Sequence, residues 1–215
     1  HTVDVQIVVN PGERVYVRNV NISGNGRTKD EVIRREVRQM ESALFNAQKV
    51  QLSRDRIDRL GFFDDVAAEV VPVEGTNNQV DVNYAVSEIP TGDLKFSVGY
   101  NTSNSVTLAG SITENNFLGT GQSLSVAVDT SKATQNLTIS TGNPYFTKNG
   151  ISQDVSAYYR KTDYSELDLS NTIYKTLGFK LIYGIPLSER HRLYVGINPE
   201  HNKITLDKNA SPLSF

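Results

Sequence analysis

Residues Asp93–Tyr100 read Asp-Leu-Lys-Phe-Ser-Val-Gly-Tyr, a strict alternation of polar and apolar side chains. A period of two is typical of a β-strand whose two faces meet different surroundings. Before this stretch the sequence carries helical patterns, and after it the same alternation recurs with Gly, Asn and Pro between the segments. We therefore expect a mixed domain followed by a series of strands. The first of these strands would carry Leu94, Phe96, Val98 and Tyr100 on one face, and Asp93, Lys95, Ser97 and Gly99 on the other.

The composition excludes several classes of function. The 215-residue chain has a net charge of −2, which gives no electrostatic reason to expect a nucleic acid partner. It contains no Cys, so disulfides, thiolate metal sites and a cysteine nucleophile are excluded. No apolar run approaches the ~20 residues of a membrane helix. Membrane β-barrels are also polar on average, because half of each strand faces the lumen, so the mean hydropathy of −0.37 fits either a soluble or a membrane β-protein.

Residues 11–88 are expected to form one domain. Residues 1–10 read as a strand ended by a turn. A strand at Arg14–Ile22 then opens the domain. Thr28-Lys29-Asp30-Glu31 has the form of a capping box, which predicts a helix from there to about Met40.

The second half of this domain has clearer signals. A helix is predicted over Ala47–Leu60, and Gly61 stands where a left-handed C-terminal cap belongs. At least one of the next two residues, Phe62 and Phe63, is expected to fill the core. Strands at Val66–Val71 and Val80–Val86 complete a β-α-α-β-β order, and residues 89–92 read as a short linker.

Residues 93–215 carry about seven alternating segments. Strand lengths near ten residues match what a tilted strand needs to cross a bilayer. The connections alternate between polar ones and ones rich in aromatic residues, Gly and Pro, as the two ends of outer-membrane barrels do, and Phe117, Tyr145 and Phe146 would lie at the membrane interface. The predicted strands are Asp93–Tyr100, Ser105–Thr113, Gln122–Thr130, Asn136–Thr141, Ser152–Lys161, Thr172–Ile185 and Arg192–Ile197, the last extending toward Leu206.

A soluble β-sandwich also alternates and is the main structural alternative. Two features favour a membrane barrel: the strands follow one another up and down without a Greek-key signal, and the inward residues are too polar for a dry core. The predicted fold class is therefore an α+β domain followed by antiparallel transmembrane β-barrel strands that form part of a barrel.

Several motifs carry a family resemblance. Val20-x-Ile22-x-Gly24-Asn25, Leu60-Gly61-Phe62-Phe63-Asp64-Asp65-Val66 and Val80-Asp81-Val82-x-Tyr84-x-Val86-x-Glu88 together resemble a POTRA domain. The later stretches resemble the opening barrel strands of the BamA family of outer-membrane barrel assembly factors: Phe96-Ser97-Val98-Gly99-Tyr100, Asn116-Phe117-Leu118-Gly119-Thr120-Gly121 and Asn143-Pro144-Tyr145-Phe146-Thr147. By this resemblance residues 1–10 are the end of a preceding POTRA repeat. Residues 11–88 are the last POTRA domain, in the periplasm, and residues 93–215 begin the barrel in the outer membrane.

The resemblance implies a protein that folds and inserts other β-barrel proteins into the outer membrane. It implies no enzyme activity, cofactor or metal. The first barrel strand, Asp93–Tyr100, would pair weakly with the last strand of the barrel and template an incoming client strand by β-augmentation. Ser97 and Gly99 agree with this role, because small side chains weaken packing at an edge that must part.

The resemblance also implies a docking site on the POTRA domain. In the family the last POTRA domain docks the lipoprotein BamD, and Arg34, Arg38 and Glu41 match that charged surface. Arg34 and Arg38 are four residues apart and would share one face of the predicted helix. From spacing alone, a solvated charged face is the simpler interpretation. Ser42-Ala43 departs from the family, which commonly has Gly there. The expected partners are a BamD-like lipoprotein, other assembly-complex lipoproteins, unfolded outer-membrane clients and the lipid bilayer.

Two other functions stay open. A related transporter with POTRA domains, as in two-partner secretion, would pass an unfolded polypeptide through its pore. An outer-membrane enzyme or passive pore would instead show clustered inward carboxylates or hydroxyls, which are scattered here. None of the three histidines has a metal partner at helical spacing, the chain has no Gly-x-Ser-x-Gly motif, and Gly24-Asn25-Gly26 reads as a turn and not a phosphate loop.

Overall fold

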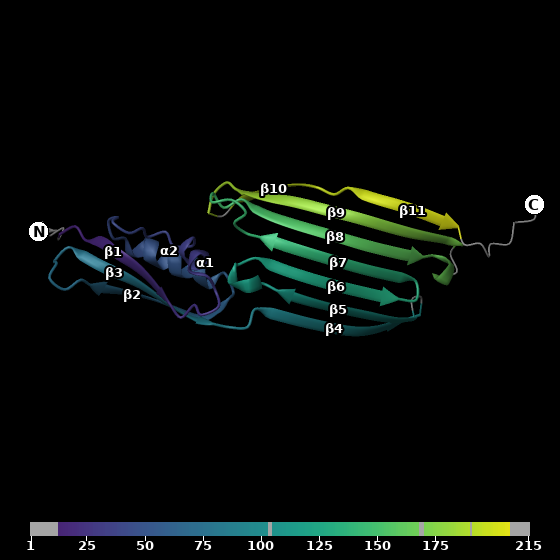
Figure 1. The fold of residues 1–215 in the computed structure, drawn as a ribbon, viewed down its shortest axis with the longest axis horizontal. Coiled ribbons are helices and arrows are strands. Elements are labelled where there is room, and N and C mark those ends of the chain that lie inside the picture. Colours follow the sequence, from purple (N-terminus) through teal and green to yellow (C-terminus); the bar gives the residue numbers. More distant parts are fainter. Residues whose placement is uncertain (1–12, 103–104, 168–169, 190, 207–215) are drawn as a thin grey trace, which may run out of the picture. The chain divides into compact units, whose positions relative to one another are not determined.

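The computed structural model describes residues 13–102, 105–167, 170–189 and 191–206. The strand predicted within residues 1–10 lies outside this part of the chain. The molecule divides into two compact units, one ending at Ile89 and one beginning at Pro90 (Figure 1). No helix among the described residues is long and apolar enough to cross a membrane.

The first unit is a three-stranded sheet with two helices. In the sheet the order is β1-β3-β2, with β1 parallel to β3 and β3 antiparallel to β2. Both phenylalanines after Gly61 are buried, and Gly61 has the predicted left-handed backbone, with φ of 70°. The elements are β1 (Tyr16–Ser23), α1 (Asp30–Arg34), α2 (Ala47–Asp58), β2 (Phe63–Pro72) and β3 (Gln79–Glu88).

The core of this unit lies between the sheet and the helices. Helix α2 begins at the cap residue Asn46, whose side-chain oxygen accepts the N–H groups of Gln48 and Lys49. It ends on a turn that leads into the buried phenylalanines. The core side chains are Val17, Val20, Val32, Ile33, Val37, Val50, Ile57, Phe62, Phe63, Val66, Val82, Tyr84 and Val86.

The prediction for the first helix is wrong in its length and its cap. Helix α1 ends at Arg34 and not near Met40, because tertiary contacts hold the residues after Arg34 in a non-helical conformation. Glu36 pairs with Arg56 of α2 at 2.7 Å, and the buried Gln39 binds backbone groups of the next loop. Met40, the predicted end of the helix, is 61% exposed.

The capping box at Thr28 does not form. The cap position is Lys29, which makes no side-chain cap hydrogen bond. The N–H groups of Arg27 and Thr28 donate instead to the carboxylate of Glu88, at 2.9 and 2.6 Å. The carboxylate of Glu88 on β3 accepts both hydrogen bonds, so Thr28 is bound to the sheet and does not cap the helix.

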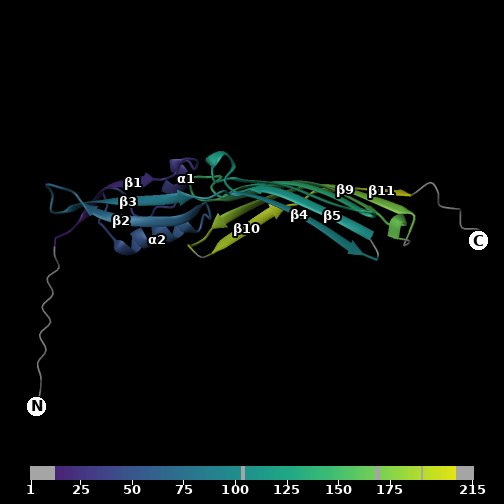
Figure 2. The same cartoon turned by 90° about the horizontal axis from the view of Figure 1, so that it is seen from below.

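The second unit is one antiparallel sheet in which neighbours along the chain pair. Its order is β10-β9-β8-β7-β6-β5-β4, and β11 also pairs with β9. The sheet is twisted and curved (Figure 2). Its strands are β4 (Gly92–Asn101), β5 (Ser105–Glu114), β6 (Ser123–Ser131), β7 (Thr134–Asn143), β8 (Ser152–Asp163), β9 (Thr172–Pro186), β10 (Arg192–Ile197) and β11 (Glu200–Leu206).

Strands β10 and β11 together form the seventh strand that the sequence predicts. Ile197 lies opposite Leu181 and Glu200 opposite Gly178, so the register continues unchanged across the interruption. The carbonyl of Pro199 still accepts the N–H of Phe179 at 3.0 Å. Because proline has no N–H to give to a ladder, the strand is interrupted at this point without changing partner.

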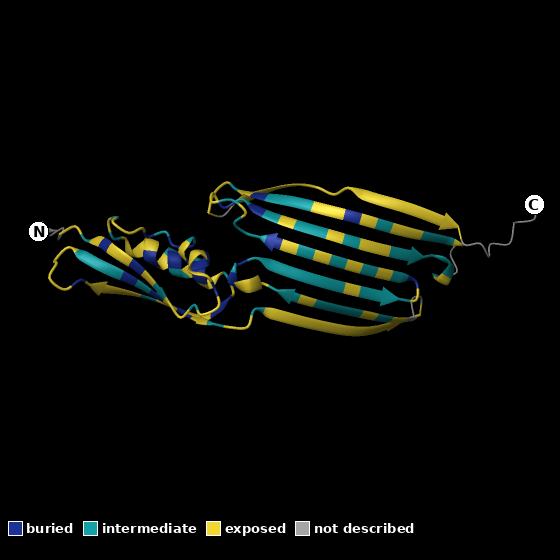
Figure 3. Cartoon of the chain, viewed as in Figure 1, coloured by how far each residue is buried: buried dark blue, intermediate teal, exposed yellow. Residues whose placement is uncertain are grey.

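The predicted division of the sheet into two faces is confirmed. Residues directly opposite each other on paired strands point to the same face. From β4 to β8, the register places Phe96 opposite Gly110, Gly110 opposite Val128, Val128 opposite Leu137 and Leu137 opposite Tyr159, so these residues share one face. Strand β4 is exposed from Gly92 to Tyr100, whereas on β5 and β6 the exposed residues are the large apolar ones, Val106, Leu108, Ile112 and Val128 (Figure 3). The opposite face carries Ser, Thr, Asn, Asp, Lys and small residues.

Candidate functional site

Strand β4 holds all eight residues predicted to form the templating edge. It pairs residue by residue with β5, from Gly92 opposite Glu114 to Asn101 opposite Ser105. Within the described residues its other edge has no partner strand. Its apolar side chains are also the most exposed of the sheet's early strands: Leu94 is 79% and Tyr100 76% exposed. An edge strand with free backbone groups is a template for another chain.

The start of β4 is tied to the turn after β5. The Thr91 hydroxyl hydrogen-bonds the carboxylate of Glu114, and Asn115 donates its N–H to the Thr91 carbonyl at 3.1 Å. Farther along, a methyl group placed on Gly99 would only just touch Thr107, with 4.0 Å between the carbons. Beside Gly99, β4 therefore has little side-chain packing on its polar face.

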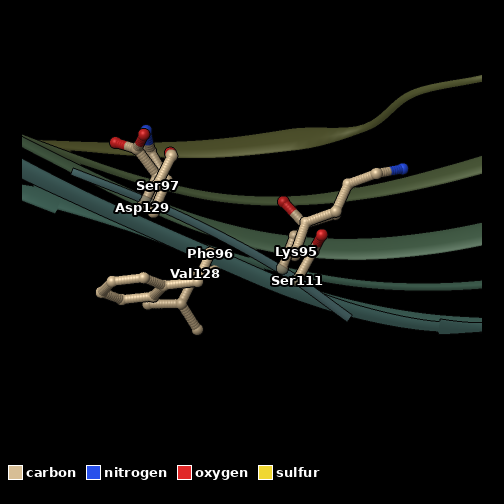
Figure 4. Close-up of a pocket in the computed structure, with 11 residues that line it drawn as sticks. Lys95, Phe96, Ser97, Ser111, Val128 and Asp129 are labelled. Carbon is tan, nitrogen blue, oxygen red and sulfur yellow. The ribbon is translucent and has the colours of Figure 1, made fainter. Parts of the chain in front are cut away.

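A hollow of about 560 Å³ lies on the polar face behind β4. Lys95, Ser97, Ser111 and Asp129 point to this side of the sheet, whereas Phe96 and Val128 point to the other (Figure 4). The sequence did not predict this hollow, because it depends on the register of four strands. Its lining comes from β4 to β7: Lys95, Phe96, Ser97, Ala109, Gly110, Ser111, Ala127, Val128, Asp129, Asn136 and Thr138.

The turn between β5 and β6 is built around a buried asparagine. Asn116 accepts the N–H of Gly121 on its side-chain oxygen at 2.7 Å. Leu118 is 77% exposed and has a left-handed backbone with φ of 52°, which is rare for a residue with a side chain. The turn thus presents Leu118 to the surroundings, a feature that the run Asn-Phe-Leu-Gly-Thr-Gly did not by itself reveal.

The three predicted docking residues do not share a helix face. Arg34 is the last residue of α1, whereas Arg38 and Glu41 follow it in irregular chain, so the four-residue spacing has no helical meaning. Arg34 and Glu41 do meet, with 3.8 Å between Nη1 and Oε1. Arg38 instead donates to the carbonyl of Arg35 at 3.0 Å, and its own N–H binds the hydroxyl of Ser53.

Arg34 and Glu41 also cover the free edge of β1. Glu41 accepts the N–H of Val20 at 2.9 Å, and Arg34 lies 3.4 Å from the carbonyl of the same residue. The next loop continues this cover, since Ser42 donates its N–H to Val17 and Ala43 accepts from it. Ser42 has φ of 61°, a conformation that glycine adopts more easily, so the departure noted in the sequence places a residue with a side chain in a less favourable backbone conformation.

Comparisons with known proteins agree with this architecture. Residues 15–89 match the POTRA family, described as a surface antigen variable number repeat, and residues 116–214 match the Omp85 superfamily domain. The outer membrane protein assembly factor BamA of Neisseria meningitidis serogroup B is 37% identical over 93% of this chain. The chain belongs to the BamA family. The factor of the same name from Neorickettsia risticii is 33% identical over 94% of the chain.

A solved structure supports the same assignment. The crystal structure of BamA from Haemophilus ducreyi lacking POTRA domains 1–3 covers 91% of this chain with a TM-score of 0.78 and 34% identity, and the chain spans 37% of it. The chain spans about a quarter of the length of the two curated BamA relatives.

Family membership places the two units in the cell. The strand unit lies in the outer membrane and the POTRA domain in the periplasm. The apolar face is then the lipid face, and aromatic residues near one end of it fit the interface. The ring of Phe146 packs against Tyr183 on this face, with 5.8 Å between ring centres.

Proposed function

We propose that this chain is part of an assembly factor that folds and inserts β-barrel proteins into the outer membrane by templating their strands on β4. The observation that carries the proposal is the weak side-chain packing along β4, where a Cβ on Gly99 would only just reach Thr107, at 4.0 Å. The names of the BamA relatives, outer membrane protein assembly factors, support the broader role.

The edge of β4 favours pairing with an incoming strand for physical reasons. A free strand edge in lipid leaves N–H and C=O groups unsatisfied, so pairing with an incoming strand is favoured. Main-chain hydrogen bonds do not depend on the client's side chains, so one edge can serve many clients. The small residues Ser97 and Gly99 reduce the side-chain packing that would hold a resident partner in place. No catalytic group is needed for this reaction, and the proposal includes no cofactor.

The proposed partners follow from the two units. Unfolded outer-membrane clients would pair with β4, and lipid would cover the apolar face. A BamD-like lipoprotein would dock on the POTRA domain at Arg34, Arg38 and Glu41, with other lipoproteins of the assembly complex nearby. Arg34 and Glu41 support this placement because both side chains are about half exposed and lie together.

The absence of Cys in the chain allows a direct test. Single cysteines would be placed at Asp93, Ser97 and Tyr100 of the full-length protein, and along the last strand of a client stalled during assembly. Templating on β4 predicts disulfides in one consistent register along the two strands. A cysteine at Ser140, on the central strand β7, is the control and should not crosslink.

The same experiment separates the proposal from polypeptide transport. A client that threads the pore would crosslink at the lumen-facing Ser97 without a fixed register, and would leave Tyr100 on the lipid face unreacted. That result would replace the insertase proposal with a transporter of the two-partner secretion type.

A further inference from the structure

In the hollow behind β4, two side chains carry hydrogen-bond acceptors that have no donor among the described residues. Asp129 lies directly opposite Asn136 on the next strand, and both face the hollow. The side-chain oxygen of Asn136 is buried and has no hydrogen-bond partner in the described structure. A buried acceptor without a donor is unfavourable, so a donor that meets this oxygen when the amide turns toward the hollow would stabilise it.

The negative charge of Asp129 is also uncompensated. Among the described residues no ion pair or hydrogen bond reaches its carboxylate, which is half-buried. Lys95, the cation that lines the hollow, is paired with Asp93 of its own strand. Arg160 lies opposite Asn136 on β8, but its guanidinium sits over the ring of Tyr158, 5.9 Å from the ring centre.

The floor of the hollow leaves space for a large side chain. Ala109, Ala127 and Ser111 extend no farther than a methyl or hydroxyl group from the sheet, so no side chain of the described residues fills the space above them. A volume of about 560 Å³ exceeds what one water molecule needs many times over.

We propose that this hollow binds a basic side chain, preferably arginine, of an unfolded client polypeptide inside the lumen. Asp129 supplies the countercharge, and the Asn136 amide, turned toward the hollow, accepts a second N–H. Arginine fits better than lysine because its planar fork presents several donors in fixed directions, and charge-assisted hydrogen bonds to a carboxylate are strong. The inference rests on the proposed function, since Lys95 and Ser97 belong to both the hollow and the templating strand.

The first test uses the full-length protein without a client. Cysteine at Ser97 would report on the hollow, and cysteine at Ser125, on the same polar face but outside the hollow, is the matched control. Acetyl-arginine amide should slow labelling of the cysteine at Ser97 by N-ethylmaleimide at least three-fold. Acetyl-glutamine amide at the same concentration should not, and neither compound should protect the cysteine at Ser125.

The substitution Asp129→Asn tests the countercharge. It keeps the size of the side chain and removes no contact of the described structure, and it should abolish the protection by the arginine compound. Asp129→Ala should do the same if the asparagine variant assembles poorly. Equal protection by both compounds, or protection that survives both substitutions, would overturn the proposal.

A second arm identifies the source of the basic group. With a stalled client whose lumen segment carries arginine, Asp129→Asn should reduce crosslinking at Ser97 several-fold and leave the edge crosslinks at Tyr100 unchanged. Loss of all crosslinks would point to failure of the templating function and not of this site. If the cysteine at Ser97 is already protected without a client, and Asp129→Asn releases it, the occupant is a segment of the protein itself and the client assignment is wrong.

Discussion

Glu41 accepts a 2.9 Å hydrogen bond from the backbone N–H of Val20, so a side chain occupies the place where a neighbouring strand would pair with β1. Arg34 approaches the carbonyl of the same residue, and the loop after Glu41 covers β1 farther along. Native proteins protect strand edges in this way against unwanted pairing. Two of the proposed docking residues therefore also have a role in the fold.

Two substitutions of Glu41 should separate these roles. Glu41→Ala removes the acceptor of the Val20 N–H and should lower the free energy of unfolding of the POTRA domain by about 0.5–1.5 kcal/mol. Glu41→Gln keeps an acceptor oxygen and should retain most of that stability. Pulse proteolysis in urea measures both. If the charge docks the lipoprotein, Glu41→Gln should still weaken its co-purification; full co-purification would show that the charge is not used.

Gly24 should be intolerant of any side chain. Its φ is 90°, and an added Cβ would overlap the carbonyl oxygen of Val86 on β3. Gly24→Ala should therefore destabilise the POTRA domain by roughly 2–4 kcal/mol, because the strained backbone and the backbone clash act together. Gly26→Ala is the control, since its Cβ would meet nothing closer than 3.8 Å. The proteolysis assay above should show a large loss for the first variant and almost none for the second.

The strands were predictable because their pattern is local, whereas α1 and the hollow were not. Alternation along Asp93–Tyr100 is set by the two faces of one strand, and it survives in β4. Helix α1 ends early because Glu36 forms an ion pair with Arg56 on α2 and the Gln39 side chain hydrogen-bonds the backbone of the following loop. The hollow depends on which residues the register brings opposite each other, such as Asp129 and Asn136, and no single segment of sequence contains that information.

Glu88 should make the POTRA domain sensitive to acid. Burial acts to raise the pKa of its carboxyl, but hydrogen bonds from Thr28 and from the Arg27 N–H outweigh it and hold the pKa below its usual value. A lowered folded-state pKa contributes stability that is present above the unfolded value of about 4.3 and is lost as the pH falls through the folded value. Glu88→Gln should thus destabilise at pH 7, and its difference from the wild type should shrink below about pH 4. A difference that stays constant with pH would contradict this account.

Tyr158 should hold the interrupted seventh strand in place. Its ring lies over Gly178 of β9, and its hydroxyl reaches Glu200 and Asn198 on the far side of that strand. An added Cβ at Gly178 would overlap the ring, so Gly178→Ala should displace Tyr158 and lower the temperature at which the full-length barrel loses its heat-modifiable migration. Tyr158→Phe keeps the ring and loses only the hydrogen bonds, which are exposed, so its effect should be smaller than that of Gly178→Ala. Gly99→Ala on β4 is the matched control, because its Cβ would only just reach Thr107. If Gly178→Ala and Gly99→Ala behave alike, the packing of Tyr158 over the glycine does not stabilise the sheet.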